Sequence, residues 1–228
     1  MPDVDGDGFG DYAISSNQIA PGSELCPLGE YRTGVVHLFS GRSGELLRTI
    51  GQPLCLSYHP NFGEYSLDGA PDVDGDGAGD LLIGSPRAVY PGRPRFSGAA
   101  YLVSGRTGAF IRTYLSPFPR PDPPGYGQFA NAVAIVPNAH ARDRVDILIG
   151  AGSECAFEPC PPNSFGRAYL FRACGADFNY DGYLNTQDFF DFIGAFFDGR
   201  SAADYDANGA VNSQDFFSFL GIFFGGCS

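Results

Sequence analysis

The sequence DVDGDGFGDYAIS at residues 3–15 recurs as DVDGDGAGDLLIGS at residues 72–85. A degraded third copy, NAHARDRVDILIGA, occupies residues 138–151. The last aspartates of the first two motifs, Asp11 and Asp80, are 69 residues apart, and the equivalent aspartate of the third copy follows after a further 66. A period of this length is typical of architectures built from repeated structural units, so one unit is predicted for each copy.

A second element repeats in phase with the first. GVVHLFSGRSGELLRTI at residues 34–50 matches GAAYLVSGRTGAFIRTY at residues 98–114, and GRAYLF at residues 166–171 begins a third copy. The runs LLIG and ILIG have β character, and the second element has the pattern of a hairpin with its turn at SGRTG. Each unit therefore holds three or four strands, with an apolar face that only a stacked neighbour can cover. Four-stranded units at this period indicate the blades of a propeller.

The aspartate motif has the spacing DxDxDGxxD, which suits a calcium ion. Calcium takes six to eight oxygen ligands in flexible geometry, and four carboxylates packed without a cation would repel one another. The alternative is an aspartate-rich turn without metal. The predicted ligands are the side chains of Asp3, Asp5, Asp7 and Asp11 with the carbonyl of Phe9, and those of Asp72, Asp74, Asp76 and Asp80 with the carbonyl of Ala78.

The third copy of the motif is predicted to hold no metal. It keeps Asp143 and Asp146 near positions that hold predicted ligands in the first two copies, but Arg142 and Arg144 now flank Asp143. Two guanidinium groups can supply the positive charge that an ion would otherwise bring.

The repeat unit resembles the FG-GAP repeat of integrin-α-type β-propellers. The resemblance rests on Phe62 and Gly63, on the DVDGDGAGD loop and on the LLIGSP that follows it. It covers about residues 1–171 and is most specific in the second unit. Complete propellers of this family are seven-bladed rings. The resemblance therefore implies a partial, all-β propeller of about 2.5–3 blades over residues 1–173, which is either incomplete or the C-terminal piece of a longer one.

The composition changes at Cys174, where a second duplication begins. DFNYDGYLNTQDFFDFIGAFFDG at residues 177–199 matches DYDANGAVNSQDFFSFLGIFFGG at residues 204–226. Each copy opens with a 12-residue loop of the EF-hand type, with glycine at its sixth position, and runs into an apolar segment that reads as a helix. The predicted calcium ligands are Asp177, Asn179, Asp181, Tyr183 (carbonyl), Asn185 and Asp188, and Asp204, Asp206, Asn208, Ala210 (carbonyl), Asn212 and Asp215.

This duplicated loop and helix resembles the type I dockerin, a small all-α, calcium-dependent module that docks on a cohesin domain. The resemblance covers residues 174–228 and implies partner recognition through Thr186, Gln187, Ser213 and Gln214. The near-identical copies imply two equivalent, rotated binding modes. The sequence departs from the family in its helices, which lack basic residues and are dense in Phe. Face-to-face packing of two helices buries about half of these rings, and the others suggest a partner surface.

The net charge of −12 is concentrated in the four loops, which hold 14 of the 26 acidic residues. This excess of negative charge argues against binding to nucleic acid or to an anionic membrane surface, since a protein binds either of them through basic residues. Ion sites explain the acidity better than a solvated acidic face does. No apolar run is long enough to span a membrane.

Six cysteines without a CxxC pair disfavour zinc and favour disulfides in an oxidising compartment. Cys174 and Cys227 bracket the C-terminal module, and Cys155 and Cys160 share one loop. The predicted pairs are Cys174–Cys227, Cys155–Cys160 and Cys26–Cys55, with free thiols as the alternative. A secreted or cell-surface location follows, although an export signal is absent from this sequence, which suggests that Met1 is not the native N-terminus.

No catalytic constellation stands out. The histidines His37, His59 and His140 are scattered, no serine has a nucleophile elbow, and the paired carboxylates lie in the calcium loops. The sequence therefore predicts a non-enzymatic scaffold or attachment protein. Its partner is a cohesin-like or surface protein, with a carbohydrate or protein ligand on the propeller loops. The alternatives are the attachment region of a larger extracellular enzyme, such as a polysaccharide hydrolase, and a structural fragment without any partner.

Overall fold

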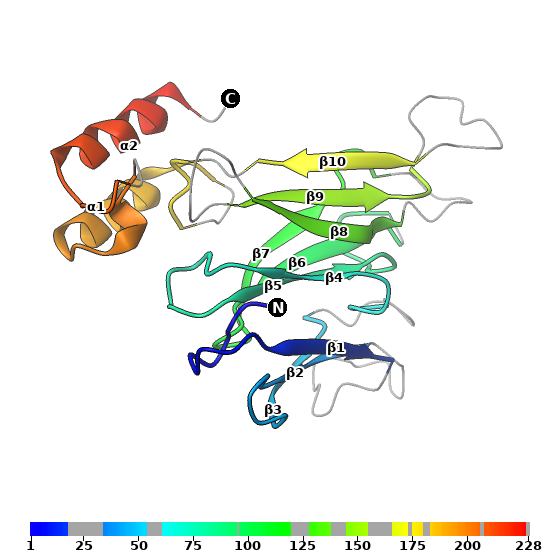
Figure 1. Cartoon of the computed structure of the whole chain (residues 1–228). Coiled ribbons are helices and arrows are strands. Elements are labelled where there is room, and N and C mark those ends of the chain that lie inside the picture. The colour runs from blue at the N-terminus through cyan, green and yellow to red at the C-terminus, as the bar shows by residue number, and fades with distance from the viewer. Residues whose placement is uncertain are drawn as a thin grey trace.

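A computed structural model gives the architecture of the chain. It describes residues 1–17, 34–53, 61–94, 96–119, 128–137, 145–154, 166–172, 175–179, 183–205 and 208–226. Over these ranges ten strands form three antiparallel sheets, and two helices follow them (Figure 1). These described residues build stacked sheets and not a closed ring.

The first and second sheets follow the sequence repeat. The first has the order β1 (Tyr12–Ser16), β2 (Val35–Phe39) and β3 (Leu46–Gly51). The second has the order β4 (Leu67–Ala70), β5 (Asp80–Ser85), β6 (Ala99–Val103) and β7 (Phe110–Leu115). The hairpin predicted around SGRTG is confirmed as β6 and β7, whose register shifts by one residue between Leu102 and Val103.

The third sheet has the order β8 (Phe129–Pro137), β9 (Val145–Ala151) and β10 (Arg167–Phe171). By sequence, β9 is equivalent to β1 and β5, and β10 is equivalent to β2 and β6. The prediction of three or four strands for each repeat is therefore confirmed.

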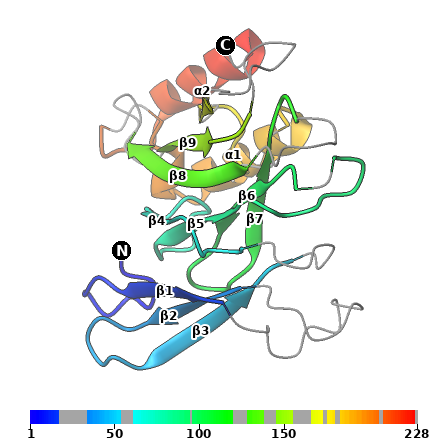
Figure 2. The ribbon, with the colours of Figure 1, turned by 90° about the vertical axis from the view of Figure 1, so that its right-hand side faces the viewer.

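The three sheets stack face to face, as two perpendicular views show (Figures 1 and 2). One hydrophobic core lies between the first and second sheets, and a second core lies between the second and third. Each sheet alone would leave the apolar residues of these cores in water, so the repeats stabilise one another by stacking.

Phe62 and Phe129 join neighbouring sheets. Both rings are fully buried, and each packs on a tyrosine of its own sheet: Phe62 on Tyr101 and Phe129 on Tyr169, each at 5.7 Å between ring centroids. The backbone of the preceding sheet passes so close that a Cβ atom at Gly98 would lie 2.2 Å from the carbonyl oxygen of Phe129. This close approach, together with a φ of +80°, requires glycine there.

The two helices predicted after the C-terminal loops are present as α1 (Thr186–Phe197) and α2 (Ser213–Gly225). Asn185 and Asn212 cap them, and each cap is completed by an aspartate three residues later. A short 3₁₀ turn, Ser201–Ala203, separates the two copies. The rings of Phe192 and Phe219 stack at 4.0 Å between centroids and form the centre of the helical core.

Some predictions lie outside the described residues. These are the six cysteines with their three pairings, and the degraded loop around Arg142, Asp143 and Arg144. None of the described helices has the length and apolar character that crossing a membrane would need.

Candidate metal sites

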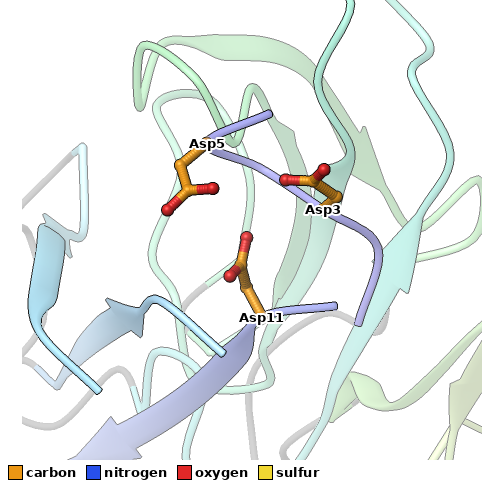
Figure 3. Close-up of side chains that lie close together, drawn as sticks. All are labelled: Asp3, Asp5 and Asp11. Atoms are coloured by element: carbon orange, nitrogen blue, oxygen red, sulfur yellow. The ribbon is translucent and has the colours of Figure 1, made fainter. Parts of the chain in front are cut away.

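Within the described part of the chain, two groups of three carboxylates are close enough to share an ion. Asp3, Asp5 and Asp11 form the first group, and their oxygens lie within 4.8 Å of one another. The three side chains point toward a common centre (Figure 3). The second group contains the equivalent residues of the next repeat, which are Asp72, Asp74 and Asp80.

The first residue of each motif folds its loop. Asp3 accepts hydrogen bonds from the backbone N–H groups of Gly6 at 2.6 Å and Gly8 at 2.8 Å. Both glycines have positive φ, +79° and +86°, which lets the chain turn back on itself. Asp72 repeats this arrangement with Gly75 at 2.7 Å and Gly77 at 2.8 Å. Two loops with the same bonds show that the motif itself specifies the fold of the loop.

The last residue of each motif is buried and anchors the loop to the following hairpin. Asp11 accepts a hydrogen bond from the N–H of Val4 at 2.6 Å and another from the N–H of Gly41 at 2.8 Å. Gly41 lies in the turn between β2 and β3. The equivalent bonds in the second loop join Asp80 to Val73 at 2.7 Å and to Gly105 at 3.1 Å.

The charges of the second loop disfavour one another in the absence of a cation. Burial raises the pKa of Asp80 to about 7, and the charges of Asp74 and Asp76 add to this effect against the backbone hydrogen bonds. Burial and the neighbouring charge of Asp76 also raise the pKa of Asp74. In the first loop the N–H of Gly8 instead lowers the pKa of Asp3. The carboxylates of these loops are thus close enough together that a bound cation would stabilise their charged forms.

The structure does not bring Asp7 and Asp76 into the three-carboxylate groups. Asp7 accepts hydrogen bonds from the N–H of Phe9 at 2.9 Å and from the hydroxyl of Ser40 at 3.5 Å. Asp76 likewise accepts from the N–H of Ala78 at 2.9 Å and the hydroxyl of Ser104 at 3.1 Å. The proposed ligand roles of these two aspartates, and of the Phe9 and Ala78 carbonyls, remain predictions.

Sequence reasoning missed the serine–glycine pairs that receive these loops. Ser40 and Ser104 bind the middle aspartates, and Gly41 and Gly105 donate to the last ones. A Cβ atom at Gly105 would lie 2.0 Å from the carbonyl oxygen of Gly79. The repeated Ser-Gly at the start of SGRSG and SGRTG could have indicated these contacts, but the same residues are equally typical of an ordinary turn.

In the C-terminal module, Asp188 and Asp215 are buried and brace their own loops. Asp188 accepts from the N–H of Phe178 and of Asn185, each at 2.8 Å. Asp215 accepts in the same way from Tyr205 at 2.7 Å and Asn212 at 2.8 Å. Asp181, Gly182 and Asp206 lie outside the described residues, so the complete ligand sets of both loops remain predictions.

The four predicted recognition residues, Thr186, Gln187, Ser213 and Gln214, are exposed in the first turns of α1 and α2. Four phenylalanine rings farther along the helices are also exposed, by 64 to 80%. They form two equivalent pairs, which are Phe190 with Phe217 and Phe197 with Phe224. We call these four rings the Phe surface.

Comparison with known proteins gives partial similarities only. No family model matches the chain. The chain is 37% identical to integrin alpha-V of Gallus gallus over 103 residues, and 35% identical to integrin alpha-5 of Xenopus laevis over 110 residues. These matches cover 41% and 45% of this chain but only 9% and 10% of the relatives. The chain thus spans about a tenth of their length, and what the comparison shows is a partial sequence similarity to integrin alpha chains.

A crystal structure of the exotype rhamnogalacturonan lyase YesX is a structural neighbour with a TM-score of 0.37 and 16% sequence identity. It covers 75% of this chain and 32% of the lyase. This likeness is too low to carry any conclusion about function.

Proposed function

We propose that this chain is a secreted, calcium-binding attachment protein without catalytic activity of its own. The observation that carries the proposal is the pair of matched carboxylate groups in two successive repeats. Its β region is a partial propeller whose turns are fastened by calcium, and its C-terminal module binds a protein partner. The similarity of the β region to integrin alpha chains supports an extracellular location, where calcium is abundant.

Calcium fits the carboxylate groups by chemistry and by size. All the converging donor atoms are oxygens, and calcium prefers oxygen ligands at about 2.3–2.6 Å. Two oxygens on opposite sides of one such ion are about 5 Å apart, which matches atoms that lie within 4.8 Å of one another. A bound ion would neutralise the buried charge and hold the start of β1 or β5 to the next hairpin. The role proposed for these ions is structural.

The C-terminal module supports an attachment role through its surface. A dockerin-like module presents the start of each helix to its partner, and Thr186, Gln187, Ser213 and Gln214 are exposed there. The Phe surface adds large apolar area that a small domain does not usually leave in water. We therefore propose a cohesin-like or other surface protein as the partner, bound through both features.

Calcium titration of the chelator-treated chain tests the metal sites. The double variant Asp5→Asn, Asp74→Asn removes one exposed carboxylate from each group, and we expect the calorimetric stoichiometry to fall by two ions. Glu45→Gln removes an exposed charge just before β3 and should leave the stoichiometry unchanged. If the double variant binds as many ions as the parent chain, the β loops are not calcium sites.

Binding to a purified cohesin domain, or to surface proteins of the source organism, tests the partner. We expect binding in calcium, its loss in chelator, and its loss in the variant Phe197→Ser, Phe224→Ser. The matched control is Tyr65→Ser, which changes an exposed ring in the β region. Binding that survives both chelator and the Phe variant would exclude the C-terminal module as the attachment site.

A further inference from the structure

We propose that the carboxylate groups of the first two repeats bind calcium cooperatively, because the first repeat forms part of the support of the second loop. The inference rests on the calcium sites proposed above and adds how they influence each other. Three contacts carry it. Each joins a residue of the first repeat to a segment that contains or binds an aspartate of the second loop.

A backbone hydrogen bond joins the two loops directly. The N–H of Gly79 donates to the carbonyl oxygen of Asp3 at 2.8 Å. Asp3 belongs to the first carboxylate group, and Gly79 immediately precedes Asp80 of the second group. Gly79 is buried, and a buried N–H without an acceptor is costly. A first loop that loses its shape therefore leaves a buried donor unpaired beside Asp80.

Val4 makes the second contact between the two sites. Its N–H donates to Asp11 of the first group, and its side chain is only 4% exposed. A Cβ atom at Gly105 would lie 2.7 Å from the Cγ1 atom of Val4, so this methyl group packs directly on the glycine backbone. Gly105 in turn donates a hydrogen bond to Asp80. One valine thus connects the buried aspartate of the first site to the anchor of the second.

Arg48 on β3 makes the third contact. Its guanidinium donates to the backbone carbonyls of Arg106 and Thr107, the latter at 2.8 Å. Ser104 and Gly105 of the same turn donate to the second loop. The first sheet therefore holds in place the turn that receives the second loop.

These contacts give the coupling a favourable sign. An ion in the first loop fixes that loop, and with it the positions of Asp3 and Val4. The second loop then loses less conformational freedom when it binds its own ion, which is a source of positive cooperativity. Coupling between two binding sites is reciprocal, so an ion in the second loop helps the first by the same factor.

The charges of the two groups act in the opposite direction. Each group contains three carboxylates, and an ion in one group weakens the negative potential that attracts an ion to the other. Salt at about 0.15 M screens exposed charges over about 8 Å, whereas packing and backbone hydrogen bonds are not screened. We therefore expect the contacts to outweigh the charges at this ionic strength.

Hydrogen exchange of the whole chain tests the inference, measured by mass spectrometry as calcium is raised in about 0.15 M salt. It follows residues 3–11 and 72–80 separately, so ions in the C-terminal module do not affect the result. We expect both loops of the parent chain to become protected at one shared calcium concentration. Asp5→Asn should raise the concentration that protects the second loop about 5-fold or more, the lower end of ordinary couplings. Asp74→Asn should raise that of the first loop by the same factor. Asparagine keeps the side-chain oxygen that each aspartate offers to the loop backbone.

Two variants outside the carboxylate groups test the contacts themselves. Val4→Ala removes the packing on the hairpin turn, and Arg48→Ala removes the bonds to its carbonyls. Both leave every predicted ligand in place, so each loop should still respond to calcium. In either background, the shift that Asp5→Asn causes at the second loop should be smaller than in the parent chain.

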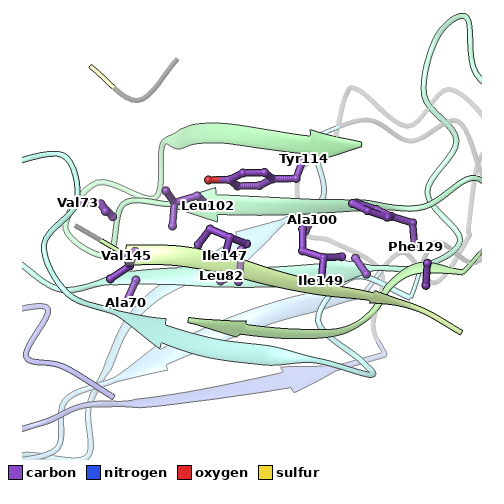
Figure 4. Packing of buried hydrophobic residues seen from close by; sticks show 12 residues of the cluster. Ala70, Val73, Leu82, Ala100, Leu102, Tyr114, Phe129, Val145, Ile147 and Ile149 are labelled. Carbon is purple, nitrogen blue, oxygen red and sulfur yellow. The ribbon is translucent and has the colours of Figure 1, made fainter. Parts of the chain in front are cut away.

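Two controls separate this effect from a general loss of stability. Ile149→Val trims the core between the second and third sheets, and Figure 4 shows Ile149 at the end of that core away from Val73 of the second loop. Arg93→Ala removes a similar bond, from Arg93 to the carbonyl of Ser116 at 3.2 Å. Neither control should change the shift caused by Asp5→Asn.

The possible failures are distinguishable. If both loops respond to calcium but each keeps its midpoint when the other site is lost, the inference is wrong and the proposed calcium sites stand. A midpoint that falls in Asp5→Asn would show that charge repulsion dominates, which also overturns the inference. Loops that do not respond to calcium at all would overturn the proposed sites together with their coupling. A shift of equal size in the parent, Val4→Ala and Arg48→Ala chains would show that the three contacts do not carry it.

Discussion

Arg112 on β7 contacts the carboxylate of Asp177 at 3.3 Å and so joins the second sheet to the C-terminal module. Asp177 is buried and opens the first 12-residue loop. The equivalent arginine of the first sheet, Arg48, instead donates a hydrogen bond to the carbonyl of Thr107 at 2.8 Å, in the β6–β7 turn of the next sheet. The same arginine position of the repeat thus contacts the next sheet in one copy and the C-terminal module in the other. In the second sheet its partner, Asp177, is a predicted calcium ligand.

We expect Arg112→Ala to destabilise the chain because it leaves the Asp177 carboxylate buried without this partner. A hydrogen bond to a charged group contributes about 1.5–3 kcal/mol, so a loss of about 2 kcal/mol in the free energy of unfolding is expected. Chemical denaturation in chelator measures it. In calcium the loss should be smaller, because a bound ion would compensate the charge of Asp177.

The control for this prediction is Arg200→Ala. Arg200 pairs with Asp198 at 3.5 Å, and both side chains are exposed. Exposed pairs contribute about 0–1 kcal/mol, so the control should change stability little. Equal losses of stability in the two variants would show that the Arg112–Asp177 contact contributes no more than an exposed ion pair.

The stacked rings of Phe192 and Phe219 should carry most of the stability of the C-terminal module. Phe192→Ala removes a fully buried ring, and we expect a loss of about 3–5 kcal/mol in the free energy of unfolding of that module. Phe190→Ala removes an exposed ring of the same helix and should cost no more than about 0.5 kcal/mol. Near-ultraviolet circular dichroism during denaturation reports the unfolding. Similar losses for both variants would contradict the packing described above.

Much of the fold could be predicted from the repeats alone. The strands β5, β6 and β7, their hairpin turn and the two helices all follow from local patterns that occur at least twice in the sequence. The matched carboxylates Asp3, Asp5 and Asp11 follow from their spacing. Each of these features depends on residues that are close together along the chain, so periodicity reveals them.

The remaining features depend on contacts between distant segments. Asp76 turns toward Ser104, which lies 28 residues later, and Arg112 reaches Asp177 across 65 residues. No local pattern reports which hairpin packs against which loop. The hydrogen bonds from Ser40 to Asp7 and from Ser104 to Asp76 therefore needed the structure.

Gly105 should be indispensable to the second carboxylate group. Its N–H binds Asp80, and an added Cβ would clash with the Gly79 carbonyl. We expect Gly105→Ala to weaken the hairpin contact and to reduce calcium binding by one ion in calorimetry. Gly221→Ala is the control, because nothing lies within 4 Å of its Cβ position in α2 and alanine favours helix by up to about 1 kcal/mol. A Gly105→Ala chain with unchanged calcium binding would show that the anchor is dispensable.

The raised pKa of Asp80 predicts opposite effects of pH on the metal-free and calcium-loaded chains. Its pKa in the folded chain is about 7, above the ordinary value of 3.8. Between these two values the folded chain keeps a proton that the unfolded chain has lost, so the stability of the metal-free chain should fall as pH rises through this window. Calcium needs the ionised carboxylate, so the stabilisation by calcium should grow over the same window. Thermal denaturation at about pH 5 and about pH 8, in chelator and in calcium, measures both trends, since these values lie on either side of the expected change. Asp80→Asn removes the titrating group, and it should flatten the fall seen in chelator and reduce the growth seen in calcium. If the parent chain and Asp80→Asn share one pH profile in chelator, Asp80 is not the group that titrates in this range.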